Sequence, residues 1–233
     1  NCFGQYMNVN TEAAGLGYVM PRDLTYVPAA TALQTLLQNY LNNHNLNIEN
    51  VLSAMIRIFG DFYRYDGDFV AKPMNNYSDY RTNIKDIISK LAELAGGIDT
   101  TTLGQAIHNA LVSVHAIDTD GKLQLSNLRF KLMHDGDTYY RCQNCGRIHL
   151  HRGLGFCTNP ACMELHNDQT AGDVNDLWQN NYISFDVMVE PHQAKRMHSE
   201  ELSGQTDDQT DRLLKFKDII IDPNSEPIAN KIA

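Results

Sequence analysis

Four of the five cysteines lie within a stretch of about twenty residues, and they form two pairs. In the first pair, Cys142 and Cys145, two intervening residues let both sulfurs reach one ion from a single tight turn. Gly146, directly afterwards, gives the backbone the freedom to fold around that ion. The second pair, Cys157 and Cys162, encloses four residues, a wider spacing that zinc sites also use. The pattern therefore predicts a zinc ion bound by all four cysteines.

Four thiolates fill the tetrahedral coordination of zinc and leave no open position for water or substrate. We therefore expect the ion to be structural and to perform no Lewis-acid chemistry. A histidine could replace one cysteine, and His149, His151 and His166 lie nearby, with His166 the favoured candidate of the three. The alternative to a metal site is a set of incidental thiols, which is the interpretation we favour for the distant Cys2.

The region around the cysteines is locally basic, because it contains Arg141, Arg147 and Arg152. The whole chain carries a net charge of −9. Phosphate neutralisation supplies most of the non-specific affinity of nucleic-acid binders, so this charge argues against nucleic acid as the main partner. A solvated loop is the favoured interpretation of the three arginines, and a tip that contacts phosphate is the alternative.

Several catalytic motifs are absent from the sequence. It contains no phosphate-binding loop with its lysine, no dinucleotide fingerprint, no paired-histidine zinc-protease motif and no nucleophile elbow. Asp61, Asp66 and Asp68 have a spacing that fits no ion-binding loop, and we interpret them as a surface turn. We therefore expect this segment to have no catalytic activity of its own.

The composition also bears on location and on completeness. No apolar run reaches the length of about eighteen residues that suggests a membrane span, so no membrane partner is expected. Clustered cysteines with metal-site spacing favour a reducing compartment, and we predict the cytoplasm. The chain begins with Asn1 rather than Met, and we expect it to be an internal piece of a longer polypeptide.

The cysteines are expected to lie in a chain of mixed α and β structure with four regions. Residues 1–28 form an irregular lead-in, 29–120 a helical bundle-like region, 121–170 a small β zinc ribbon, and 171–233 the start of an α/β lobe. Four apolar stripes of helical period predict the helical region. They comprise Leu33, Leu36, Leu37, Tyr40 and Leu41; Ile48 to Phe59; Ile84 to Ala95; and Leu103 to Val114.

Residues that cap helices mark the ends of three of these elements. Asn47 is expected to cap the second helix, Thr100 or Thr101 the fourth, and Gly96-Gly97 to end the third.

Strands are expected where β-forming residues cluster. Residues 138–140 predict one strand, and 147–156 can hold two short strands with Gly153 and Gly155 at the turn between them. The alternation in 182–189 predicts a further strand. A short helix capped by Thr206 and a strand at 218–222 would follow it. Strand, helix and strand in this order are typical of an incomplete α/β unit.

Two segments resemble bacterial superfamily-2 DEAD/DEAH-box helicases with a C-terminal domain of unknown function, several of them linked to phage defence. The first joins residues 128–134 (LRFKLMH) to 140–146 (YRCQNCG), and the second is 200–209 (EELSGQTDDQ) with Arg212 and Phe216. In such helicases, a stretch comparable to the first segment follows the first motor lobe. The second resembles the early part of a second RecA-like lobe, so residues 171–233 would begin such a lobe.

The resemblance covers roughly residues 125–233 and implies an internal, non-catalytic segment of a large ATP-dependent DNA helicase or translocase. ATP would bind only in the parent protein, because the phosphate-binding loop and the acidic box of this family are missing here. DNA would be reached through the parent protein, and other subunits or lobes would be protein partners, in an antiviral defence context. The alternative is a zinc-ribbon helical adaptor between proteins, with no motor attached, which the net charge favours.

Overall fold

The computed structural model describes residues 10–22, 24, 27–62, 73–165, 169–189, 196–197 and 220–221. The chain divides into two compact units, Asn1–Ser184 and Phe185–Ala233. The first unit holds all the cysteines of the predicted metal site.

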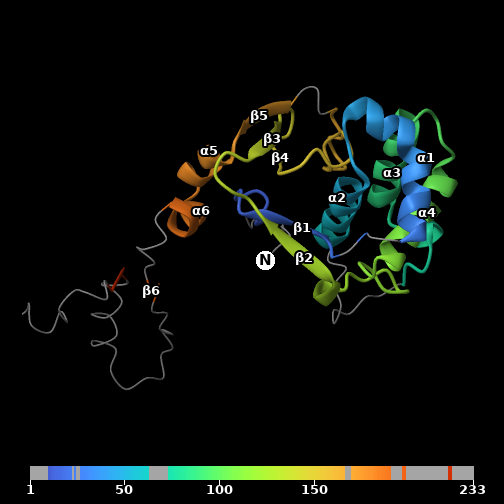
Figure 1. Cartoon of the computed structure of the whole chain (residues 1–233), viewed down its shortest axis with the longest axis horizontal. Helices are drawn as coiled ribbons and strands as arrows, with labels where there is room; N and C mark the ends of the chain where they lie inside the picture. Colours follow the sequence, from blue (N-terminus) through green and yellow to red (C-terminus); the bar gives the residue numbers. More distant parts are fainter. Residues whose placement is uncertain are drawn as a thin grey trace, which may run out of the picture. The chain divides into compact units, whose positions relative to one another are not determined.

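Four helices form most of the core of the first unit (Figure 1). Each buries the apolar stripe that the sequence predicted, because residues three and four apart share one face of a helix. Helix α4 packs against α1 and α3, and α1 also contacts α2. The four predicted helices are therefore confirmed as α1 (Pro28–His44), α2 (Ile48–Asp61), α3 (Thr82–Leu94) and α4 (Thr100–Ser113).

Two of the three predicted helix ends are confirmed. The side chain of Asn47 accepts a hydrogen bond of 2.8 Å from the backbone N–H of Asn50 and so caps α2. Helix α3 ends just before Gly96 and Gly97, which take φ angles of 95° and 77°. These left-handed angles cost glycine nothing, so the pair ends the helix as expected.

The predicted cap of α4 at Thr100 or Thr101 is wrong. Asp99 occupies the cap position, and its carboxylate accepts a 2.8 Å hydrogen bond from the backbone N–H of Thr102. A charged acceptor at the positive end of a helix competes well with a hydroxyl. Both threonines therefore fall inside the first turn of α4.

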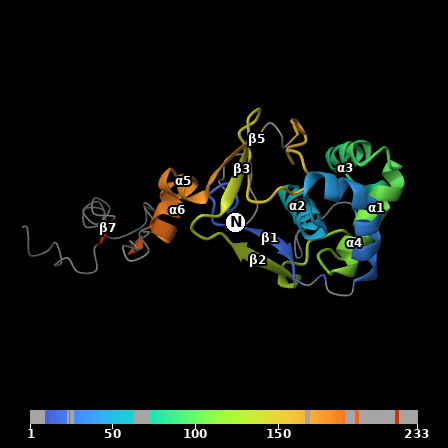
Figure 2. The same cartoon turned by 45° about the horizontal axis from the view of Figure 1, so that its top comes forward.

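A two-stranded antiparallel sheet joins the lead-in to a segment more than a hundred residues later. Strand β1 (Gly17–Pro21) pairs with β2 (Leu128–Leu132), and the two lie side by side in both views (Figure 1, Figure 2). The prediction that residues 1–28 are irregular is therefore wrong for 17–21. Because the partner strand is so distant along the chain, no local pattern announces this pairing.

A second, three-stranded sheet holds Cys142, and Cys145 lies on the turn between two of its strands. Its order is β4–β3–β5, with β3 (Thr138–Cys142) antiparallel to both β4 (Ile148–His149) and β5 (Gln169–Asp173). The predicted strand at 138–140 is confirmed within β3. Of the two short strands expected in 147–156, the first is β4, which pairs with β3. The second is wrong, because Phe156 forms only a single bridge and its partner is Leu165.

The predicted strand at 182–189 is wrong. Helix α5 (Val174–Gln179) is followed by the helical turn α6 (Tyr182–Ser184) and a π-helical turn over Phe185–Val189. The side chain of Asn181 accepts hydrogen bonds from the backbone N–H groups of Ile183 and Ser184, which starts a helical turn. This local cap outweighs the alternation of apolar residues.

The described part of the second unit is small. Strands β6 (Arg196–Met197) and β7 (Ile220–Ile221) pair antiparallel, and β7 lies within the predicted strand 218–222. The predicted helix capped by Thr206 lies outside the described residues. Mixed helix and strand are thus established, whereas a RecA-like lobe remains a prediction.

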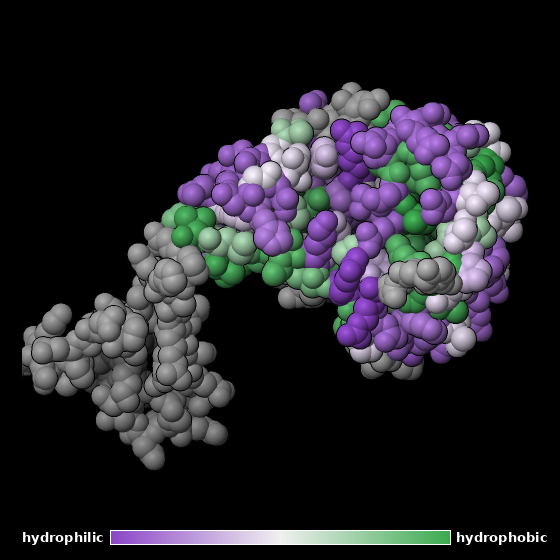
Figure 3. All heavy atoms as spheres, viewed as in Figure 1, coloured by the Kyte–Doolittle hydropathy of each residue, from purple (hydrophilic) through white to green (hydrophobic). Residues whose placement is uncertain are grey.

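The predicted ribbon and the helices share one core. Leu154 and Phe156, from the loop between the two cysteine pairs, are fully buried in the same cluster as the apolar residues of all four helices. On the face shown in Figure 3, hydrophilic side chains predominate and hydrophobic ones gather in separate patches. Within the described ranges, no helix combines the length and the apolar character needed to cross a bilayer.

Candidate metal centre

The first cysteine pair lies on a tight turn that leaves β3. The backbone N–H of Gly146 donates to the carbonyl of Cys142 at 2.8 Å, and the N–H of Cys142 donates to the carbonyl of Arg147 at 3.0 Å. Gly146 has a φ of 73°, in the left-handed region that a glycine adopts without strain. The turn thereby folds Cys145 back over Cys142, as the spacing predicted.

The second cysteine pair is held by a turn of its own. The backbone N–H of Cys157 donates to the carbonyl of Glu164 at 2.7 Å, which closes the loop between the two cysteines. Within it, the N–H groups of Cys162 and Met163 donate to the carbonyl of Asn159 at 2.9 and 3.0 Å. Backbone hydrogen bonds therefore fix the turn from which both sulfurs of this pair project.

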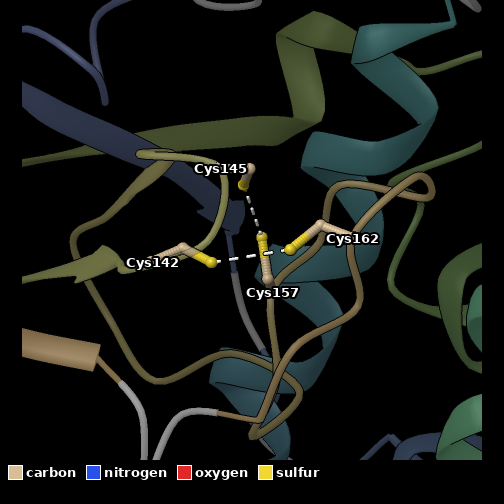
Figure 4. A group of neighbouring side chains, drawn as sticks. All are labelled: Cys142, Cys145, Cys157 and Cys162. Carbon is tan, nitrogen blue, oxygen red and sulfur yellow. Dashed lines mark hydrogen bonds between the residues drawn. The ribbon is translucent and has the colours of Figure 1, made fainter.

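The four sulfurs point toward one another from the two turns (Figure 4). All lie within 4.8 Å of one another, with Sγ–Sγ distances of 3.6 Å between Cys142 and Cys162 and 3.5 Å between Cys145 and Cys157. Zinc–sulfur bonds of about 2.3 Å give a tetrahedron with edges of about 3.8 Å. Shifts of about 1 Å or less thus bring every pair to that spacing. The four side chains fit a single metal ion.

The protonation of the thiols differs across the group. Burial disfavours the thiolate of Cys145, but hydrogen bonds from the Arg147 backbone and from neighbouring side chains lower its pKa to about 7. Burial raises the pKa of Cys157, and the nearby Cys145 raises it further. Burial likewise raises the pKa of Cys162. Cys145 can therefore supply a thiolate near neutral pH, and binding of a cation would displace the protons of Cys157 and Cys162.

Histidine does not join the group within the described residues. His149 and His151 are buried, but the set of side chains that can hold a metal comprises the four cysteines only. His166, the favoured substitute ligand, lies outside the described residues.

A buried ion pair connects β4 and the adjacent Leu150 to helix α2. The Arg57 guanidinium lies 2.6 Å from a carboxylate oxygen of Glu12, and both side chains are less than a tenth exposed. Arg57 also donates to the Ile148 carbonyl at 2.9 Å, while Glu12 accepts from the Leu150 N–H at 3.2 Å. Burial pushes the pKa of Glu12 up and that of Arg57 down, and the charge of each opposes the shift of the other. The contact distance is that of an ion pair.

Two further contacts anchor the loop that carries the cysteines. Arg147 forms an ion pair with Asp61 at the end of α2, and this carboxylate raises the pKa of Arg147 against the opposing effect of burial. The hydroxyl of Tyr40 on α1 donates to the carbonyl of Leu154 at 2.7 Å in a buried position. The helices therefore hold the loop at three points: Arg57–Ile148, Asp61–Arg147 and Tyr40–Leu154.

The three arginines that the sequence offered for contact with phosphate lie in different environments. Arg147 is engaged by Asp61 and faces the protein. Arg141 and Arg152 are exposed and lie over the rings of Tyr139 and Tyr140, at 5.8 and 5.3 Å from the ring centroids. Only these two present their charge outward.

No sequence pattern indicated the buried Glu12–Arg57 pair, since Glu12 lies in the stretch expected to be irregular. A comparison of the chain with models of known protein families, with curated proteins and with solved structures found no match. The geometry of the cysteine group is therefore the main basis for a functional conclusion.

Proposed function

We propose that this chain is a non-catalytic module in which a structural zinc ion pins the loop 142–162 to a helical core. The observation that supports this most strongly is the convergence of four cysteine sulfurs within 4.8 Å of one another. Sulfur ligands in a tetrahedral arrangement suit zinc, and four of them leave no site for a reacting water.

The surroundings of the sulfurs support a structural role. Cys142 and Cys157 are buried, and the loop between the pairs supplies Leu154 and Phe156 to the core. Structural zinc contributes about 10 kcal/mol or more to the folding of small isolated modules. In this chain, the ion would therefore hold in place residues on which the packing of α1 and α2 depends.

A chelator experiment tests the structural role. Zinc-loaded protein is titrated with a strong chelator while near-ultraviolet circular dichroism reports the packing of aromatic side chains, and Cys162→Ser is compared with Cys2→Ser as the matched control. We expect chelation to cause a loss of packing that added zinc reverses. We also expect weaker zinc retention in Cys162→Ser and unchanged retention in Cys2→Ser. Chelation that removes zinc and leaves the packing intact contradicts the proposal.

For the wider context, we propose an internal segment of a large ATP-dependent DNA helicase or translocase in the cytoplasm. Its support is the resemblance of residues 128–134 and 140–146, which span β2, β3 and the first cysteine turn. The other resembling segment, 200–209, lies outside the described residues. ATPase activity of a longer protein that contains this chain, with none from the chain alone, is the expected outcome. Activity from the chain alone contradicts it.

The net charge of −9 favours a second candidate, an adaptor that joins other proteins. The two candidates differ in what flanks the chain, because a motor requires a phosphate-binding loop with its lysine upstream. An ATPase-inactive longer protein that still binds protein partners favours the adaptor.

A further inference from the structure

A polar cavity of about 320 Å³ lies beside the metal loop, residues 142–162. Its walls come from the turn between α1 and α2, from the β1–β2 sheet and from the segment that follows β4. This volume is at the lower end of the range of small-molecule sites, about 300–1,000 Å³. It suits one small ligand or a single residue of a polymer.

Two cations line this cavity, Lys131 on β2 and Arg152 on the metal loop. Aromatic rings that also line it lie beside them. The ammonium of Lys131 is 5.7 Å from the Tyr18 ring centroid, and the Arg152 guanidinium is 5.3 Å from that of Tyr140. Cation–π contacts orient the charged groups without neutralising them. Across the described part of the chain, neither cation forms an ion pair with a carboxylate.

The cavity has one lining carboxylate, that of Glu49, and it is compensated. Arg129 lies 2.6 Å from a Glu49 oxygen. The charges of Glu49 and Arg129 cancel, so Lys131 and Arg152 leave a local formal charge of +2. The net charge of the whole chain is −9. A phosphate monoester carries about −1.5 to −2 at neutral pH, which matches that local charge.

Three asparagines also line the cavity. They are Asn45, Asn47 and Asn50, and a side-chain amide carries two donors and an acceptor. The oxygen of Asn47 already accepts the backbone N–H of Asn50, so Asn47 contributes chiefly its donors. Asn45 takes a left-handed φ of 51° at the end of α1, Asn47 caps α2, and Asn50 lies in the first turn of α2. Groups that donate and accept together suit the hydroxyls of a sugar and the edge of a base. Inorganic phosphate has no sugar and no base.

We propose that this cavity binds a nucleoside monophosphate unit, with its phosphate at Lys131 and Arg152 and its sugar and base at the asparagines. The unit is either a free nucleotide or one nucleotide of a single strand. This site goes beyond the zinc module and rests on it in one respect, since the metal loop positions Arg152.

Calorimetric titration of the zinc-loaded chain tests the site with three probes: adenosine monophosphate, inorganic phosphate and a short single-stranded oligoadenylate. The nucleotide is expected to bind more tightly than phosphate. Lys131→Gln and Arg152→Gln are each expected to weaken nucleotide binding by about tenfold, the usual cost of losing a charged hydrogen bond.

Matched controls are available elsewhere in the first unit. Lys85 lies 5.9 Å from the Tyr77 ring and Arg81 lies 6.0 Å from the Phe62 ring, so each mimics one of the cavity cations. Lys85→Gln and Arg81→Gln make the same change of charge away from the cavity. Both are expected to leave nucleotide affinity unchanged within about twofold.

The outcomes identify the source of the nucleotide. They also distinguish failure of this site from failure of the proposed zinc centre. Tighter binding of oligoadenylate than of the monophosphate identifies a nucleotide within a strand, and the reverse identifies a free nucleotide. Failure of both to bind protein that retains one zinc per chain overturns the site alone. Binding that Lys131→Gln and Arg152→Gln leave unchanged overturns it equally. Zinc content is measured for every variant, because its absence contradicts the structural centre instead.

Discussion

The buried pair of Glu12 and Arg57 supports a quantitative prediction. The two side chains are 6% and 7% exposed and lie 2.6 Å apart. Arg57→Met keeps most of the side-chain volume and leaves the carboxylate buried with its hydrogen bond from Leu150 only. Loss of one partner of a buried ion pair costs about 3–5 kcal/mol, and Glu12→Gln is expected to fall in the same range for the opposite reason.

The double variant decides whether the ion pair itself is the cause. Glu12→Gln with Arg57→Met removes both charges, so its destabilisation is expected to be smaller than the sum of the single changes by about 2–3 kcal/mol. Urea unfolding of the zinc-loaded chain, followed by circular dichroism, measures all three variants. Lys90→Met is the control, because Lys90 pairs with Glu93 at 3.2 Å on the surface, where a pair contributes about 0–1 kcal/mol. Additive single changes would refute the reasoning.

Three further predictions concern helix packing. Tyr40→Phe leaves the buried Leu154 carbonyl without its donor and should lower the free energy of unfolding by about 1–3 kcal/mol in urea. Burial raises the pKa of Tyr40 to about 12. The stability of the wild-type chain is therefore retained below about pH 10 and lost as the pH rises through 12. A pH series of the free energy of unfolding should show a flatter decline in Tyr40→Phe. In Gly104→Ala, the new methyl would lie 2.2 Å from the Tyr77 ring. Thermal melting should therefore show about 1–3 kcal/mol of destabilisation. Lys90→Ala, on the surface of α3, is the control and should show none of this effect.

The sequence was sufficient for features that depend on local chemistry. The four helices follow from apolar residues three and four apart, and Asn47 caps α2 as its position suggested. The cysteine spacing correctly predicted that four sulfurs would converge, because each pair is brought together by a turn of its own. In these cases, all the residues that decide the structure are close neighbours along the chain.

Features that depend on distant partners could not be predicted. Strand β1 exists because Tyr18 and its neighbours pair with β2, more than a hundred residues away. Distance along the chain also hid the contact of Glu12 with Arg57 and that of Asp61 with Arg147. The second contact makes a supposed surface aspartate a partner of the metal loop. The wrong strand at 182–189 has a different cause, since the Asn181 side chain starts a helical turn there that alternation of apolar residues does not reveal.

X-ray absorption at the zinc edge, combined with metal analysis of the purified chain, tests the central claim most directly. The account predicts one zinc per folded chain with four sulfur neighbours at about 2.3 Å. A folded chain without metal, or a shell that contains oxygen in place of one of the sulfurs of Cys142, Cys145, Cys157 and Cys162, would contradict it.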